Sequence, residues 1–184
     1  TPVAIIECDN CIAILKSILW LLIKVITSGF LLPLVLLDNL SNNQLCDATV
    51  SPYYSSIGTH IRHILDFYDC IFSTDAENRI DLTARSRNKD VEYDCGCAQD
   101  YLNFIIGRLG SIALDINEAV LVVDDLGLGK LEIPYTYGSL LAHANSHTIH
   151  HYAIINYIFD SLEIVINDTE FGYNPTTPKH VSAF

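Results

Sequence analysis

Methionine is absent from this chain of 184 residues, and positive charge is scarce, with 10 Lys and Arg against 22 Asp and Glu. The formal net charge of −12 argues against a surface for nucleic acids, because contacts to phosphates need clustered cations. The basic residues are scattered, and the acids Asp81 and Asp90 dilute their only local cluster. That cluster consists of Arg79, Arg85, Arg87 and Lys89. We therefore predict no nucleic-acid partner.

Charged residues in general are few, at 17% of the chain, whereas 50% of the residues are hydrophobic. Such a composition excludes global disorder and provides enough apolar material for a sizeable core. The sequence shows no internal repeat, and its length is that of one ordinary domain. We expect a single domain over residues 1–184.

The sequence shows no basic segment followed by a small-residue cleavage site, the pattern typical of a secretory signal. A chain of this size and hydrophobicity folds without disulfides, so its six cysteines predict free thiols in a reducing compartment. The pairs Cys8/Cys11 and Cys95/Cys97 offer four thiolates, but their spacing matches no common structural zinc site. The expected location is the cytoplasm.

Residues 12–37 form the most apolar stretch, which is long enough to span a bilayer. Two lysines interrupt it, Gly29 and Pro33 disfavour a continuous helix, and no polybasic flank fixes an orientation. We therefore favour a buried helix inside residues 3–27 that ends near Ile26, followed by a break and a short apolar segment. A membrane-associated helical protein is the alternative.

Three further segments carry apolar residues at helical spacing. They cover residues 55–73, 96–117 and 139–162. Ser55 or Ser56 can cap the first of these helices, and Asp94 can cap the second, because their side-chain oxygens accept hydrogen bonds from free backbone N–H groups.

The segments between the predicted helices have different characters. Residues 73–94 are polar and predict a long surface loop, whereas residues 119–136 combine β-branched residues with two glycines and predict a short extended excursion or hairpin. Residues 167–184 predict an irregular tail. The expected fold class is therefore all-α, a four-helix bundle with a short extended excursion before the last helix.

Six of the seven histidines fall on two of the predicted helices. One helix carries His60 and His63, and the other carries His143, His147, His150 and His151. Spacings of three and four place side chains on one helical face. Buried imidazoles are costly unless they have partners, and two of them at i and i+4 can bind one cation together. The pattern favours a metal site over a set of unliganded surface histidines.

Two short motifs resemble signatures of the DinB/YfiT-like superfamily. Ser56-Ile57, then His63 and Asp66, resembles the signature of its second helix, and His147-Thr148-Ile149-His150-His151 resembles the HxxHH signature of its fourth. The likeness extends from about residue 40 to Pro178. This resemblance implies a four-helix bundle of DinB/YfiT type, often a homodimer, with a divalent nickel, zinc or iron ion.

Carried over residue by residue, the resemblance implies His63, His147 and His151 as the metal ligands. Better-known relatives are thiol-dependent enzymes, such as mycothiol-dependent maleylpyruvate isomerase and the bacillithiol S-transferases. The extra imidazoles of His60 and His143 depart from the family pattern and could replace or support a ligand. No thiol-binding residue can be matched, so neither the substrate nor a low-molecular-weight thiol cofactor is carried over.

Three neutral ligands leave the charge of a metal undiminished, so a bound water or thiol can lose its proton near neutral pH. We therefore expect a small-molecule hydrolase or thiol S-transferase. Asp66 and His150 are the candidate catalytic residues, with His60 as a further base. Asp66 can alternatively orient a histidine ligand. Cys70 is expected in the core. A non-catalytic, stress-associated metal-binding protein is the alternative function.

Overall fold

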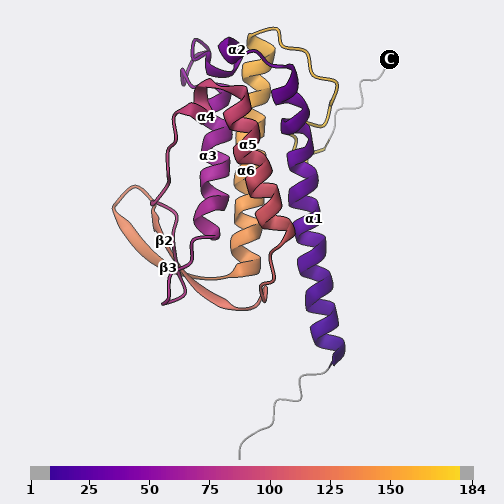
Figure 1. Ribbon diagram of the computed structural model, residues 1–184, viewed down its shortest axis with the longest axis vertical. Coiled ribbons are helices and arrows are strands. Elements are labelled where there is room, and N and C mark those ends of the chain that lie inside the picture. The colour runs from indigo at the N-terminus through magenta and orange to yellow at the C-terminus, as the bar shows by residue number, and fades with distance from the viewer. Residues whose placement is uncertain (1–8, 179–184) are drawn as a thin grey trace, which may run out of the picture.

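The computed structural model describes residues 9–178, apart from the side chains of residues 9–13 and Leu32. The long helices are α1 (Asp9–Asn39), α3 (Ile57–Ile71), α5 (Cys95–Gly110) and α6 (Tyr137–Ser161). They run side by side along the longest axis of the molecule (Figure 1). The short helices α2 (Asn42–Cys46) and α4 (Asp90–Tyr93) lie together at one end.

A small sheet lies at the other end of the long helices. Its strands are β1 (Arg79–Asp81), β2 (Ala119–Asp125) and β3 (Lys130–Thr136), in the order β1-β2-β3. β1 is parallel to β2, with Arg79 opposite Leu121, and β2 is antiparallel to β3, with Ala119 opposite Thr136. The predicted hairpin at 119–136 is confirmed, but the expectation of an all-α fold is corrected to a helix-rich fold with a three-stranded sheet.

The β2–β3 hairpin turns through two glycines in the left-handed region, Gly127 and Gly129, with φ of 99° and 105°. Their backbone N–H groups donate to one carboxylate oxygen of Asp125, at 2.8 and 3.1 Å. This turn needs glycine because other residues rarely adopt such φ values. The chain continues from these glycines into strand β3 and not directly into a helix, so they do not form a phosphate-binding loop.

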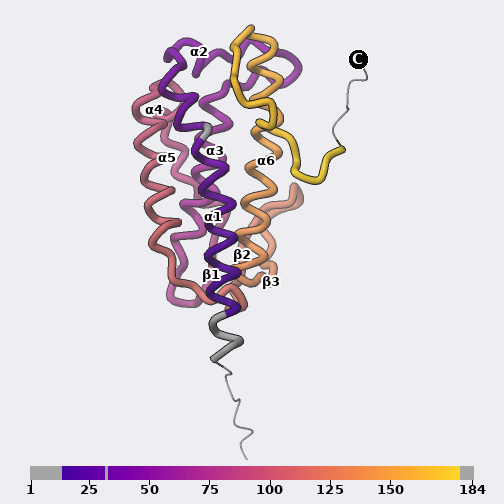
Figure 2. Tube along the Cα trace, turned by 90° about the vertical axis from the view of Figure 1, so that its right-hand side faces the viewer, coloured from indigo at the N-terminus to yellow at the C-terminus, as the bar shows by residue number. Residues whose placement is uncertain are grey.

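Helix α1 is continuous through Pro33, so the predicted break near Gly29 and Pro33 is wrong. Interior proline costs about 3 kcal/mol in an exposed helix, but here Ile26, Phe30, Pro33 and Leu37 are all buried on one face. That face packs against α5 and α6, and Figure 2 shows α1 running between these two helices along the same axis. Tertiary packing on both sides of the proline therefore outweighs its local cost.

Local hydrogen bonds explain where the other helices begin and end. Ser56 and Asp94 cap α3 and α5 as predicted, through Thr59 N at 3.1 Å and Cys97 N at 2.9 Å. Helix α5 ends at Gly110 instead of continuing to 117, because the chain leaves the helix to enter β2. The predicted loop at 73–94 also contains β1 and α4. Residues 167–178 contain neither helix nor strand, as expected for the tail.

The core lies between the long helices and includes the fully buried Tyr68, Phe159 and Leu65. Cys70 belongs to this core, and burial raises the pKa of its thiol to about 11. The four cysteines with described side chains, Cys46, Cys70, Cys95 and Cys97, are free. Cys8, one of the four thiols considered for zinc, lies outside the described residues.

One described helix is long and apolar enough to cross a membrane by length and composition, over Ile14–Asn39 of α1. The core helix of a soluble protein passes the same test. The side of α1 that carries Leu19, Ile26 and Phe30 is buried against the other helices. The opposite side is exposed and carries apolar side chains.

Candidate metal centre

Three histidine rings converge between α3 and α6, which lie side by side and pack along their lengths (Figure 1). His63 comes from α3, and His147 and His151 come from successive turns of α6. The Nε2 atom of His147 lies 3.1 Å from Nε2 of His63 and 3.1 Å from Nε2 of His151. One nitrogen from each ring lies within 4.8 Å of the other two.

These separations fit a shared cation. Two ligand nitrogens that each lie about 2.0–2.1 Å from a zinc ion are roughly 3 Å apart when they occupy neighbouring coordination positions. The buried Nδ1 of His147 has no hydrogen-bond partner among the described residues. Imidazole is also the commonest metal ligand in proteins. The three residues named from the sequence thus form a group that could hold a metal ion.

Burial keeps these imidazoles neutral, which is the form that binds metals. It lowers the pKa of His63 from 6.5 to about 4, with a further contribution from the positive charge of Arg85. Burial and the neighbouring His63 lower the pKa of His147 to about 3, and burial and His147 lower that of His151 to about 2. At neutral pH the group therefore offers lone pairs without first losing protons.

His60 lies behind His151 and outside the triad. Its Nδ1 is 2.8 Å from Nδ1 of His151, and its Nε2 is 2.8 Å from the Ser55 hydroxyl. This chain of contacts fixes the orientation of the His151 ring, as hydrogen bonds to the second nitrogen of metal-binding histidines commonly do. Burial, with a smaller contribution from His150, lowers the pKa of His60 to about 4.

The structure does not bring Asp66 into hydrogen-bonding contact with the triad. Its fully buried carboxylate accepts hydrogen bonds from the Arg62 guanidinium at 2.5 Å, the Ser86 hydroxyl at 3.0 Å and the Tyr101 hydroxyl at 3.2 Å. The backbone N–H of Arg87 donates to the same carboxylate at 3.3 Å. Asp66 therefore fastens the loop after β1 to α3.

Two other predicted site residues lie beside the triad. His150 is exposed, with its ring centroid 5.2 Å from that of His151. His143 lies one turn before His147, stacks on Tyr135 and packs edge-on against Phe67. Neither belongs to the group whose nitrogens converge.

Sequence reasoning missed Arg85, whose Nη1 lies 3.0 Å from Nδ1 of His63. The local cluster of basic residues in 79–89 was a usable signal, because it is the only concentration of positive charge in a strongly acidic chain. Spacing alone could not show that one member of the cluster reaches α3.

No family model matches the chain, and comparisons with curated proteins and with solved structures likewise find no match. The resemblance to DinB-like proteins therefore depends on the two histidine motifs alone. The geometry of the triad is independent of that resemblance.

Proposed function

We propose that His63, His147 and His151 hold one divalent cation, and that the protein is a metal-dependent enzyme with the four-helix bundle of the DinB-like superfamily. The convergence of three Nε2 atoms, with separations of 3.1 Å on either side of His147, is the observation that carries the proposal. The order and spacing of the two motifs support the assignment to the superfamily.

The surroundings of the triad favour a catalytic over a sealed structural site. All three rings are only partly buried, which fits an accessible site better than a sealed one. A bound divalent cation would supply the positive charge that lowers the pKa of a water or thiol to near neutral. The proposed reaction class is hydrolysis or thiol transfer on a small molecule, and nickel, zinc and iron are the candidate metals.

The protein's own residues would hold and orient the reactants. His60 and Ser55 fix the ring of His151, and the exposed imidazole of His150, with its ring centroid 5.2 Å from that of His151, is the proposed proton acceptor. Asp66 is a positioning residue in this proposal, because its carboxylate is occupied by Arg62 and the loop after β1. A homodimer in the cytoplasm is the proposed state.

The test measures metal content by elemental analysis of the purified protein and of single variants. We expect about one divalent ion per wild-type chain and its loss in His63→Ala, His147→Ala and His151→Ala. The matched control is His143→Ala, which removes a neighbouring imidazole outside the triad and should retain the metal. Hydrolase and thiol-transfer assays with the metal-loaded protein follow.

Metal content that survives all three substitutions would refute the site. A stoichiometric metal with no activity in either assay class would instead support the non-catalytic metal-binding protein.

A further inference from the structure

Arg85 brings an uncommitted positive charge to the edge of the histidine triad. Its Nε donates to the Leu82 carbonyl at 2.9 Å, and its Nη1 lies 3.0 Å from Nδ1 of His63. Among the side chains that the structure describes, no carboxylate forms an ion pair with it, although the chain carries 22 acidic residues. By contrast, the nearby Arg62 is paired with both Asp66 and Glu92.

The contact between Arg85 and His63 specifies where the imidazole carries its proton. A guanidinium has donors and no acceptor, so Nδ1 of His63 must be the acceptor. A neutral ring that accepts at Nδ1 is protonated at Nε2, which is the atom that faces His147. A metal needs the lone pair of Nε2, so the proton must move to Nδ1, where it would point at the guanidinium. Arg85 and a cation therefore cannot hold a neutral His63 at the same time.

The other contacts of the triad pose no such conflict. Nδ1 of His151 faces His60, whose ring can either donate or accept, and His60 in turn faces the Ser55 hydroxyl, which can do both. The Nε2–Nε2 contacts inside the triad are replaced by the cation itself, so Arg85 is the group around the triad that loses its partner when the cation binds.

We propose that Arg85 is an exchangeable anion-binding residue. It holds His63 in the metal-free protein, and it turns to an oxyanion, a carboxylate or phosphate on the ligand, once the cation is bound. This inference rests on the proposed metal site. The planar fork of a guanidinium matches the oxygens of both groups, and a cation beside it adds further attraction for negative charge.

Contacts of the loop after β1 hold Arg85 near the proposed metal site while its terminal nitrogens change partner. Asp66 accepts hydrogen bonds from the Ser86 hydroxyl at 3.0 Å and the Arg87 backbone at 3.3 Å, so the backbone that follows Arg85 is tied to α3. The Leu82 carbonyl holds Nε. Because the guanidinium is a rigid plane, Nη1 leaves His63 when the side chain turns about its methylene torsions, which also releases Nε from Leu82 while the backbone contacts to Asp66 stay in place.

The experiment compares Arg85→Gln with Arg87→Gln, a matched control that removes the same charge from an exposed residue of the same loop. Isothermal titration with zinc should show affinity about tenfold or more tighter for Arg85→Gln, because a competitor and a like charge are removed. Acetate and inorganic phosphate are then titrated into the cobalt-loaded protein and followed by visible absorption. Anion affinity should fall about tenfold or more in Arg85→Gln and be unchanged in Arg87→Gln.

The two anions distinguish a carboxylate ligand from a phosphate ligand, since the physiological class should bind more tightly to the wild type. A wild type that binds zinc, with Arg85→Gln unchanged in both metal and anion affinity, would overturn this inference and leave the metal site standing. A wild type that binds no divalent cation would overturn both. Long-range ¹H–¹⁵N spectra of the metal-free protein give a further check, because a proton on Nδ1 of His63 would contradict the Arg85 contact directly.

A second inference concerns the exposed side of α1. Five apolar side chains on that side, each about half exposed, are Ile14, Ile18, Leu21, Val25 and Val35. We call them the α1 outer stripe. The first four members are separated by four, three and four residues. Ser28 follows three residues after Val25, and Val35 lies seven residues after Ser28. When the seven-residue gap is counted as two steps, the mean spacing is 3.5 residues. This is the period of a helix that packs along another helix in a coiled coil.

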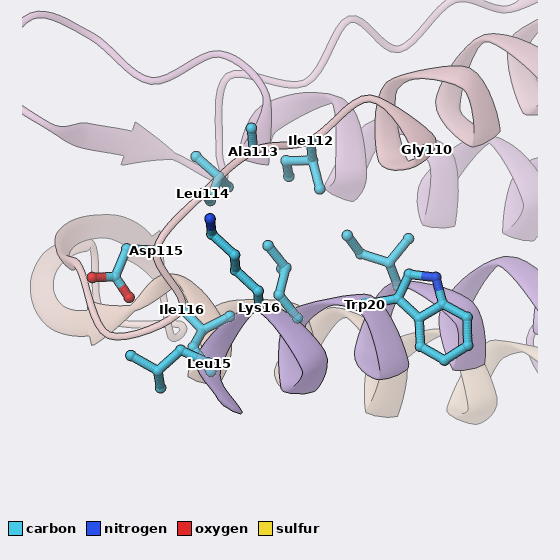
Figure 3. Close-up of a pocket in the computed structure, with 11 residues that line it drawn as sticks. Leu15, Lys16, Trp20, Gly110, Ile112, Ala113, Leu114, Asp115 and Ile116 are labelled. Carbon is cyan, nitrogen blue, oxygen red and sulfur yellow. The ribbon is translucent and has the colours of Figure 1, made fainter. Parts of the chain in front are cut away.

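A groove beside this stripe extends the apolar surface. It has a volume of about 670 Å³ and lies between the N-terminal half of α1 and the connection from α5 to β2. Figure 3 shows Trp20 and Lys16 of α1 on one side and Ile112 and Leu114 of the connection on the other. The side chains of Trp20 and Leu31, which flank the stripe, are 62% and 60% exposed.

We infer that the α1 outer stripe pairs with the same stripe of a second copy in antiparallel orientation. A two-fold axis near the middle of the stripe places Ile18 opposite Val35 and Val25 opposite Ser28. It also brings the C-terminal end of one helix, with Asp38, toward the half of the other that carries Lys16 and Lys24. The stripe and its flanking side chains expose on the order of 700 Å², close to the ~800 Å² per partner of a standard interface.

The structure favours a second copy over a bilayer as the partner. The inner face of α1, with Ile26 at 2% and Phe30 at 1% exposed, belongs to the core. Inserting α1 across a membrane would strip this face from α5 and α6. Two lysines also lie among the exposed residues of the helix.

The test is sedimentation equilibrium at micromolar concentration on the wild type, on Leu21→Glu and on Leu128→Glu. Leu128 is fully exposed in the β2–β3 turn, so its substitution makes the same change in charge away from α1. We expect a dimer for the wild type and Leu128→Glu, and a monomer with unchanged circular dichroism for Leu21→Glu. A wild-type monomer overturns the inference, and flotation of that monomer with phosphatidylglycerol vesicles would identify a lipid surface instead. A dimer that survives Leu21→Glu also overturns it.

Discussion

Acidification of the metal-free protein should destabilise it well before its carboxylates become protonated. The pKa values of His60, His63, His147 and His151 are lowered by burial from 6.5 to between about 4 and about 2. The unfolded chain therefore binds more protons than the folded chain below pH 6.5. Stability conferred by these rings is present above pH 6.5 and is lost as the pH falls toward the folded-state values.

The expected size of the effect follows from the same shifts. A histidine with a pKa of 6.5 unfolded and about 4 folded loses about 2 kcal/mol of folding free energy between pH 7 and pH 5. The four histidines together set an upper limit of about 7 kcal/mol. The rings are partly exposed and interact with one another, so solvent screening reduces the expected loss to roughly half of that limit. Small domains have only about 5–15 kcal/mol of stability, so even this loss is large.

Urea unfolding followed by far-UV circular dichroism, with a chelator present, measures this loss at pH 7.0, 6.0 and 5.0. His151→Gln should show a pH slope shallower by about one proton, because it removes the ring whose pKa burial and His147 lower most. An unfolding free energy that stays constant from pH 7 to pH 5 would show that burial does not disfavour the charged rings, and the argument would fail.

Two further substitutions test contacts around the site. His60→Gln should weaken metal binding by about 10–100-fold without abolishing it, because His60 contacts the ring of His151 and fixes its orientation. A metal titration measures the change, and complete loss of binding would instead make His60 a ligand. Gly58→Ala should lower the free energy of unfolding in urea by about 1–3 kcal/mol, because the added methyl group overlaps the Glu92 carbonyl oxygen. Gly107→Ala in α5, where a methyl group meets nothing within 4 Å, should be neutral or stabilising, and equal effects at the two positions would contradict the packing argument.

The histidines that converge could be named from the sequence because their geometry is local. His147 and His151 are four residues apart on one helix, and α-helical periodicity alone puts them on one face. The choice of His63 over His60 was different, since both lie on α3 and only the resemblance selected between them. The structure directs Nε2 of His63 toward His147 and leaves His60 in contact with His151.

Features that depend on contacts distant in sequence could not be predicted. β1 forms only by pairing with β2, where Ile80 lies opposite Val122, and its short polar sequence gives no strand signal of its own. The continuity of α1 through Pro33 likewise depends on burial against α5 and α6. The local sequence favours a loop at β1 and a helix break at Pro33, and tertiary packing outweighs both preferences.

The position of Arg85 depends most strongly on such distant contacts. It is set by a buried network in which Arg62 binds both Asp66 and Glu92, while Asp66 also holds Ser86 and the backbone of Arg87. Buried ion pairs often add little net stability, because removing the charges from water offsets their attraction. They do penalise any other arrangement, since a displaced loop would leave Asp66 buried and partly unpaired. The network therefore fixes the loop on α3 and holds a guanidinium beside His63 that is free to change partner.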